Sequence, residues 1–102
     1  MTDISQQRKV LIGRVLYGAG TASQSERLAA FENIGLAEPL KTLIQKVANQ
    51  ATAVTDRDVA AVRESDLTED QIFEIVICAA IGQSTRQYES ARAALEAAIS
   101  KE

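Results

Sequence analysis

Apolar residues along this chain recur at steps of three and four, the spacing that places side chains on one face of a helix. A segment between Asp3 and Tyr17 has this pattern. A second segment shows it most clearly, at Leu40, Leu43, Ile44, Val47, Ala48 and Ala51. Alternating β-branched runs and Asn-Gly or Asp-Gly turns, which indicate strands and hairpins, do not occur in the sequence. The pattern therefore predicts an all-α protein.

Helix starts are marked by residues that can satisfy the free N–H groups of a first turn. Three pairs have the spacing of a capping box: Ser23 with Glu26, Thr55 with Asp58, and Thr68 with Gln71. Asp3 with Gln6 is a further cap, and Pro39 suits the first turn of a helix because its missing N–H costs nothing there. Gly35 is the expected left-handed stop of the second helix. About five helices are predicted.

The last predicted helix changes character at Gly82. From Ile72 to Ile81 only Glu74 is polar, so this half should be buried at the centre of the domain or of an assembly. Beyond Gly82 the apolar residues form a narrower stripe. We expect a neighbouring element to approach Gly82 closely. The alternatives are a kink, or a tolerated glycine that costs about 1 kcal/mol relative to alanine.

Length and charge limit the classes of function. The 102 residues are enough for one small domain, 1–102, but too few for two independent cores. The net charge of −3 comes from 11 basic and 14 acidic residues that are mixed along the chain, which argues against a nucleic-acid partner. The longest apolar run, Ile75 to Ile81, is too short for a membrane span, and the first residues lack a secretory signal. These features predict a soluble, cytoplasmic protein with no membrane partner.

The sequence contains one cysteine, Cys78, and no histidine. An intramolecular disulfide, a zinc finger and a Ser-His or Cys-His pair therefore cannot be built within one chain. The acidic residues near the fourth and fifth helix starts lack the ligand spacing and glycine turn of a calcium loop. We expect no metal and no cofactor, and we assign no catalytic residue.

The segment VTDRDVAAVRESDLTEDQIFEIVICAA, residues 54–80, resembles the alkylhydroperoxidase D and carboxymuconolactone decarboxylase superfamily. In that family a short helix, a turn and the pattern L-[ST]-E-[DE]-x-I-[FL]-E begin a long buried helix. The resemblance covers the latter half of the chain. It implies an all-helical fold of alkylhydroperoxidase D type, similar to small bacterial members, and assembly into homo-oligomers such as dimers, trimers or hexamers.

Active members of that superfamily resemble one another most in a Cys-x-x-Cys pair followed by a histidine, with a glutamate nearby. The usual spacing places the two cysteine positions near Ala51 and Val54 and the histidine near Asp58, so none of the three is retained. The resemblance therefore does not imply thiol peroxidase activity. It gives no support to decarboxylation either, because decarboxylase members also rely on histidine.

Two residues of the last helix are candidates for chemistry on their own. Cys78 could be a lone peroxidatic thiol, but an apolar run and the nearby Glu74 would both raise its pKa, so a buried packing role is favoured. Glu74 could act as a general acid or base with a raised pKa. The favoured alternative is an early-turn glutamate that faces solvent or the arginine of a partner.

Polar residues gather just after the buried half of the last helix, at Gln83, Arg86 and Tyr88. The guanidinium of Arg86 suits a carboxylate or phosphate, and glutamine can bind an amide or carbonyl. A small acidic ligand could be held by Glu74, Gln83, Arg86 and Tyr88. The favoured alternative is that this polar cluster binds no ligand and only marks the point where the last helix leaves the core.

The leading hypothesis is a non-redox, helical, oligomeric module that acts as a structural or interaction protein. An apolar segment that five short helices cannot cover would be buried by symmetric copies of the same chain. The alternative is a small-molecule-binding protein or a cofactor-free enzyme that uses Glu74, Gln83, Arg86 and Tyr88 at a subunit interface. A peroxidase that uses Cys78 is the least favoured hypothesis.

Overall fold

The computed structural model describes residues 2–100, with side chains described from residue 6 onward. The described chain forms five α-helices: α1 (Thr2–Tyr17), α2 (Gln24–Glu32), α3 (Leu40–Asn49), α4 (Asp56–Arg63) and α5 (Glu69–Ser100). A 3₁₀ turn, η1 (Ala51–Ala53), links α3 to α4. Residues 2–100 contain no strand, so the predicted all-α class and the number of helices are confirmed.

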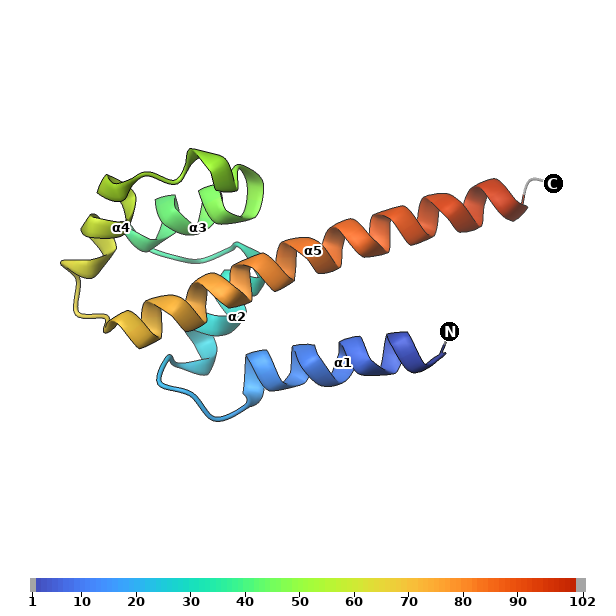
Figure 1. Ribbon diagram of the computed structural model, residues 1–102, viewed down its shortest axis with the longest axis horizontal. Coiled ribbons are helices and arrows are strands. Elements are labelled where there is room, and N and C mark those ends of the chain that lie inside the picture. The colour runs from blue at the N-terminus through green and yellow to red at the C-terminus, as the bar shows by residue number, and fades with distance from the viewer. Residues whose placement is uncertain (1, 101–102) are drawn as a thin grey trace.

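Helix α5 is the axis on which the other helices pack (Figure 1). Its 32 residues are about 48 Å long at 1.5 Å per residue, which accounts for most of the 55 Å longest dimension of the molecule. Helix α1 runs antiparallel beside α5, α2 crosses it, and α3 and α4 lie on the side away from α1 (Figure 1). The last turns of α5 extend beyond the other helices.

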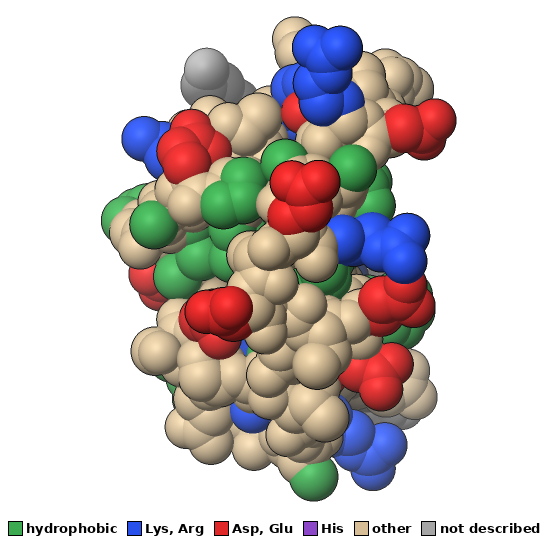
Figure 2. Space-filling view, turned by 90° about the vertical axis from the view of Figure 1, so that its left-hand side faces the viewer, with side chains coloured by type: hydrophobic (Ala, Val, Ile, Leu, Met, Phe, Trp, Pro, Cys, Tyr) green, Lys and Arg blue, Asp and Glu red, His purple; other side chains and the backbone are tan. Residues whose placement is uncertain are grey.

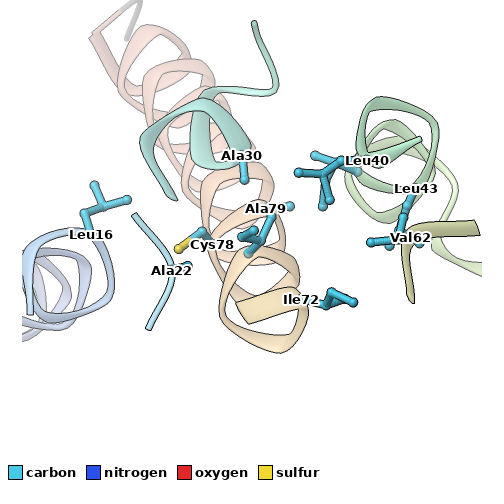
Figure 3. Close-up of a cluster of buried hydrophobic side chains, with 11 residues drawn as sticks. Leu16, Ala22, Ala30, Leu40, Leu43, Val62, Ile72, Cys78 and Ala79 are labelled. Carbon is cyan, nitrogen blue, oxygen red and sulfur yellow. The ribbon is translucent and has the colours of Figure 1, made fainter. Parts of the chain in front are cut away.

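The core surrounds the first half of α5. Ile75 and Cys78 of α5, Ile44 of α3 and Val62 of α4 are the largest fully buried side chains. Figure 3 shows α5 between α1 on one side and α3 with α4 on the other. The predicted burial of this half is correct for the faces that meet these helices. Phe73 is 66% exposed in the single chain, so burial of this position in an assembly stays a prediction.

Two of the predicted capping boxes form in full. Thr55 Oγ1 accepts from Asp58 N at 3.2 Å, and Asp58 Oδ2 accepts from Thr55 N at 2.9 Å. Thr68 and Gln71 exchange the equivalent bonds at 3.1 and 2.8 Å. Each reciprocal pair satisfies two backbone donors that the helix itself leaves free.

The remaining helix-end predictions are borne out in part. Ser23 accepts from Glu26 N at 3.1 Å, and the Ser23 hydroxyl donates to the Glu26 carboxylate. Helix α2 ends earlier than expected, because Asn33 (φ 55°) is its left-handed cap, while Gly35 (φ 84°) lies in the following loop. Pro39 directly precedes α3. The expected cap at Asp3 lies outside the described side chains.

Gly82 is a site of close approach, as predicted, and α5 continues through it as one helix. A Cβ atom at this position would overlap the Phe31 carbonyl oxygen at the end of α2. The missing side chain therefore allows α2 to cross α5 closely. Within residues 2–100, no helix combines the length and the apolar character needed to cross a bilayer.

Candidate functional site

The carboxylate of Glu74 binds the loop that precedes α2. Its oxygens accept from Thr21 N at 3.0 Å and from Ala22 N at 3.3 Å, and the Thr21 hydroxyl also donates to it. The Thr21 hydroxyl, with the two backbone donors, lowers the pKa of Glu74, although its partial burial acts in the opposite direction. A general acid would need a raised pKa, so the prediction of a raised pKa for Glu74 is wrong for the single chain.

Buried Arg27 lies behind this loop and connects it to the end of α1. It is only 5% exposed, and its Nη1 donates to the Val15 carbonyl at 3.3 Å and to the Gly18 carbonyl at 2.8 Å. These carbonyls belong to the last turn of α1 and the residue that follows it, where a helix favours positive charge. Arg27 Nε has no partner among the described atoms. Arg27 thus holds α1, α2 and their loop together.

The Cys78 thiol is 1% exposed and donates weakly to the Val15 carbonyl at 3.7 Å. Burial raises its pKa, the nearby positive charge of Arg27 acts in the opposite direction, and Glu74 raises it again. A buried thiol with a raised pKa is a poor nucleophile. The predicted packing role of Cys78 therefore fits its surroundings.

The Arg86 side chain binds the C-terminal end of α2. Its Nη1 donates to the Phe31 carbonyl at 2.6 Å, and its Nη2 donates to Gln83 Oε1 at 3.0 Å. The last carbonyls of a helix lack partners within the helix, so a guanidinium at this position satisfies one of them. The same Phe31 carbonyl lies against Gly82, where a Cβ atom would overlap it. Gln83 and Arg86 are thus engaged in joining α5 to α2.

Four of these residues lie on α5 at steps of four: Glu74, Cys78, Gly82 and Arg86. Each meets α1, α2 or the loop between them. We call this set the 74–86 stripe. A step of four keeps side chains close to one face of a helix, so the stripe is a continuous line of contact.

Tyr88 lies elsewhere, in a cleft between α1 and α5. The guanidinium carbon of Arg8 is 4.5 Å from the centroid of the Tyr88 ring, and Arg8 Nη2 donates to Thr85 Oγ1 at 3.2 Å. The cleft has a volume of about 180 Å³, and Lys9, Arg92 and Glu89 contribute its other charges. No sequence motif marks Arg8 as a site residue, because its contact with Thr85 joins positions 77 residues apart.

The four predicted ligand residues are therefore not brought together within one chain. Glu74 faces the α1–α2 loop, Gln83 and Arg86 reach the end of α2, and Tyr88 lines the α1–α5 cleft. Glu74 and Tyr88 are about 21 Å apart along the helix axis, from fourteen steps of 1.5 Å. A shared site at a subunit interface stays a prediction.

An apolar groove lies between α3, α4 and the first turns of α5. It has a volume of about 350 Å³, and its apolar lining consists of Leu43, Val47, Val54, Val59, Ile72, Phe73 and Val76. The ion pair between Arg63 and Glu69 also lines it. Figure 2 looks onto this end of the molecule, where hydrophobic side chains gather in a band with acidic and basic side chains around it.

Among the described side chains, no cluster of three or more His, Cys, Asp or Glu residues could hold a metal ion. No family model matches the chain, and neither does any curated protein or any solved structure. The resemblance to the alkylhydroperoxidase D superfamily therefore stays a prediction.

Proposed function

We propose that this chain is a self-assembling helical module, a structural or interaction protein of alkylhydroperoxidase D type without the redox chemistry of that superfamily. The observation that carries this proposal is the apolar groove with Phe73 beside it, 66% exposed. Its free, buried thiol is compatible with the reducing cytoplasm that we propose as its compartment.

The groove is the kind of surface that assembly would cover. Seven of the nine residues that line it are apolar, and one of these seven, Phe73, presents an exposed aromatic ring. Removing such surface from water is favourable by about 25 cal/mol per Å². Large apolar patches on a protein surface commonly mark interaction sites.

We propose that a second copy of this chain occupies the groove. Each copy offers an exposed ring, Phe73, and a concave apolar surface that can receive one, so a two-fold axis would satisfy both copies at once. The charges are also self-complementary, because Arg63 and Glu69 lie side by side at the groove. Across a two-fold axis, Arg63 of one copy can face Glu69 of the other.

The buried state of Cys78 supports a non-redox role. A thiol that is 1% exposed, with a pKa raised by burial, presents little thiolate to a peroxide. The chain contains no histidine to assist it. A peroxidase based on Cys78 therefore remains the weakest candidate.

The alternative is a binding protein or cofactor-free enzyme that uses Glu74, Gln83, Arg86 and Tyr88 at a subunit interface. Three of these residues already have partners within the chain: Thr21 for Glu74, and Phe31 for Arg86, which also binds Gln83. A ligand would have to replace these bonds, so this alternative ranks below assembly.

The decisive experiment measures molar mass by light scattering during size-exclusion chromatography. The wild-type protein is expected to be a dimer; a trimer or hexamer would also support assembly and would replace the two-fold arrangement. Phe73→Lys is expected to weaken the association at least about a hundredfold, because a buried aromatic anchor is lost from both copies.

The matched control is Ile34→Lys, which alters a side chain that is 70% exposed and lies outside the groove. This variant should associate as the wild type does. A wild-type protein that stays monomeric at about 100 µM would contradict the proposal. Equal weakening by Ile34→Lys and Phe73→Lys would also contradict it.

A further inference from the structure

The α1–α5 cleft concentrates positive charge on a protein whose net charge is −3. Arg8 and Lys9 come from α1, and Arg92 comes from α5. Glu89 is the one carboxylate that lines the cleft with them. A concave surface with an excess of one charge attracts ligands of the opposite charge.

The guanidinium of Arg8 is held in position before any ligand arrives. One of its nitrogens donates to Thr85, and its Cζ atom lies over the Tyr88 ring, 4.5 Å from the ring centroid. Arginine carries five N–H donors in a rigid fork, so most of them remain after the bond to Thr85 is made. A fixed fork loses less freedom on binding than a free side chain does.

Arg92 can join Arg8 at little cost. It pairs with Glu89 at 3.3 Å and with Glu96 at 3.5 Å, and its side chain is 53% exposed. Exposed ion pairs contribute only about 0–1 kcal/mol, so a ligand can replace one of these carboxylates. Glu89 can then leave the cleft, because α5 places it on the exposed surface.

We propose that the α1–α5 cleft binds a small organic anion, in which a carboxylate or phosphate group is attached to an apolar group. Arg8 and Lys9 bind the oxyanion, and Arg92 closes on it from α5. The Tyr88 ring and the Ile12 side chain contact the apolar group. The volume of about 180 Å³ limits the ligand to a small one, below the usual 300–1,000 Å³ of drug-sized sites.

This binding does not rest on self-association, since all of the residues involved come from one chain and none of them lines the apolar groove. A protein that remains monomeric could still bind the anion. A protein that forms a dimer could equally fail to bind the anion. The two proposals can therefore fail separately.

The test is a titration followed by backbone amide chemical shifts in two-dimensional NMR. Phenyl phosphate and benzoate are the two probes, and the stronger one identifies the preferred oxyanion. We expect saturable shifts at residues 8–12 and 85–92, with a dissociation constant in the millimolar range or below. Inorganic phosphate should bind more weakly than phenyl phosphate because it lacks the apolar group.

Arg8→Gln is expected to weaken binding of the stronger probe about tenfold, because a charge-assisted hydrogen bond is lost. Lys9→Gln should weaken binding about threefold. Because Lys9 is exposed, this substitution should not change the stability of the fold. The control is Arg14→Gln, an exposed arginine of α1 that lies outside the cleft, and it should bind as the wild type does.

Three results would overturn the proposal. The first is the absence of saturable shifts with both probes. The second is shifts that map outside α1 and the second half of α5. The third is equal binding by the wild type, Arg8→Gln and Lys9→Gln.

Discussion

The two sides of α5 differ in how far the rest of the chain covers them. On one side, the 74–86 stripe meets α1, α2 and their loop through hydrogen bonds and close packing. On the other side, Phe73 is 66% exposed beside an apolar groove. Leu95, on the projecting end of the helix, is 61% exposed.

This difference separates residues that hold the fold from residues that are available for function. Glu74 and Arg86 look chemically promising because they are charged and lie within or just after the apolar half of α5. Their hydrogen-bonding groups are nevertheless engaged with Thr21 and Phe31. A polar residue in a buried helix is thus often a structural partner for the backbone ends of a neighbouring helix.

The largest expected effect is at the closest contact of the stripe. Gly82→Ala places a Cβ atom onto the Phe31 carbonyl oxygen, and α2 cannot move away without losing its packing on α5. The overlap should cost about 3 kcal/mol, more than the ~1 kcal/mol that alanine gains in helix propensity. Urea denaturation followed by circular dichroism should therefore show a net loss of about 2 kcal/mol.

Gly13→Ala is the matched control for this prediction. Gly13 is also inside a helix, but a Cβ atom there would have no neighbour within 4 Å. This variant should gain about 0.5–1 kcal/mol in the free energy of unfolding. A loss at both glycines would show that helix geometry, rather than the approach of α2, determines the effect.

The next largest effect concerns Glu74 and depends on pH. Glu74→Gln removes the charge that accepts from Thr21 and Ala22, and should lower the free energy of unfolding by about 1 kcal/mol at neutral pH. This value allows for the partly exposed position of the carboxylate.

The pKa of Glu74 is lower in the folded chain than in the unfolded chain, where a glutamate has a pKa of about 4.3. The unfolded state therefore binds the proton first as the pH falls, and the stability that Glu74 contributes is lost as the pH falls through the folded pKa. The difference between wild type and Glu74→Gln should be full at pH 7 and shrink below about pH 4. A difference that stays constant down to pH 2.5 would contradict the charged role of Glu74.

Local signals were sufficient to predict the fold class and most helix starts. Thr55 with Asp58 and Thr68 with Gln71 interact within three residues, so their spacing alone predicts the capping bonds that form. The end of α2 was predicted wrongly because Asn33 and Gly35 both tolerate the left-handed conformation. The choice between them depends on where the chain turns toward α3.

The candidate site depended on long-range contacts that no local pattern specifies. Glu74 meets Thr21 across 53 positions, and Arg86 meets Phe31 across 55. The step of four from Glu74 to Arg86 was a usable signal, since it predicts one shared face of a helix. The contact of Arg8 with Thr85 depends on the antiparallel placement of α1 beside α5, which the sequence pattern does not predict.

A smaller effect is expected at the end of the stripe. Arg86→Ala removes the donor to the Phe31 carbonyl and should cost about 0.5–1 kcal/mol in the free energy of unfolding. Arg57→Ala, which alters an exposed arginine of α4, should change it by less than about 0.5 kcal/mol. Equal effects at the two arginines would show that Arg86 does not stabilise the fold. Arg86 would then again be a candidate ligand residue.

The smallest effect is expected at the projecting end of α5. Leu95→Lys should change the free energy of unfolding by less than about 0.5 kcal/mol, because a side chain that is 61% exposed buries little area in the single chain. The same variant should keep the molar mass of the wild type in size-exclusion chromatography, whereas Phe73→Lys should lower it. If Leu95→Lys dissociated the assembly and Phe73→Lys did not, the covering copy would lie on the end of α5. The groove would then be the free surface.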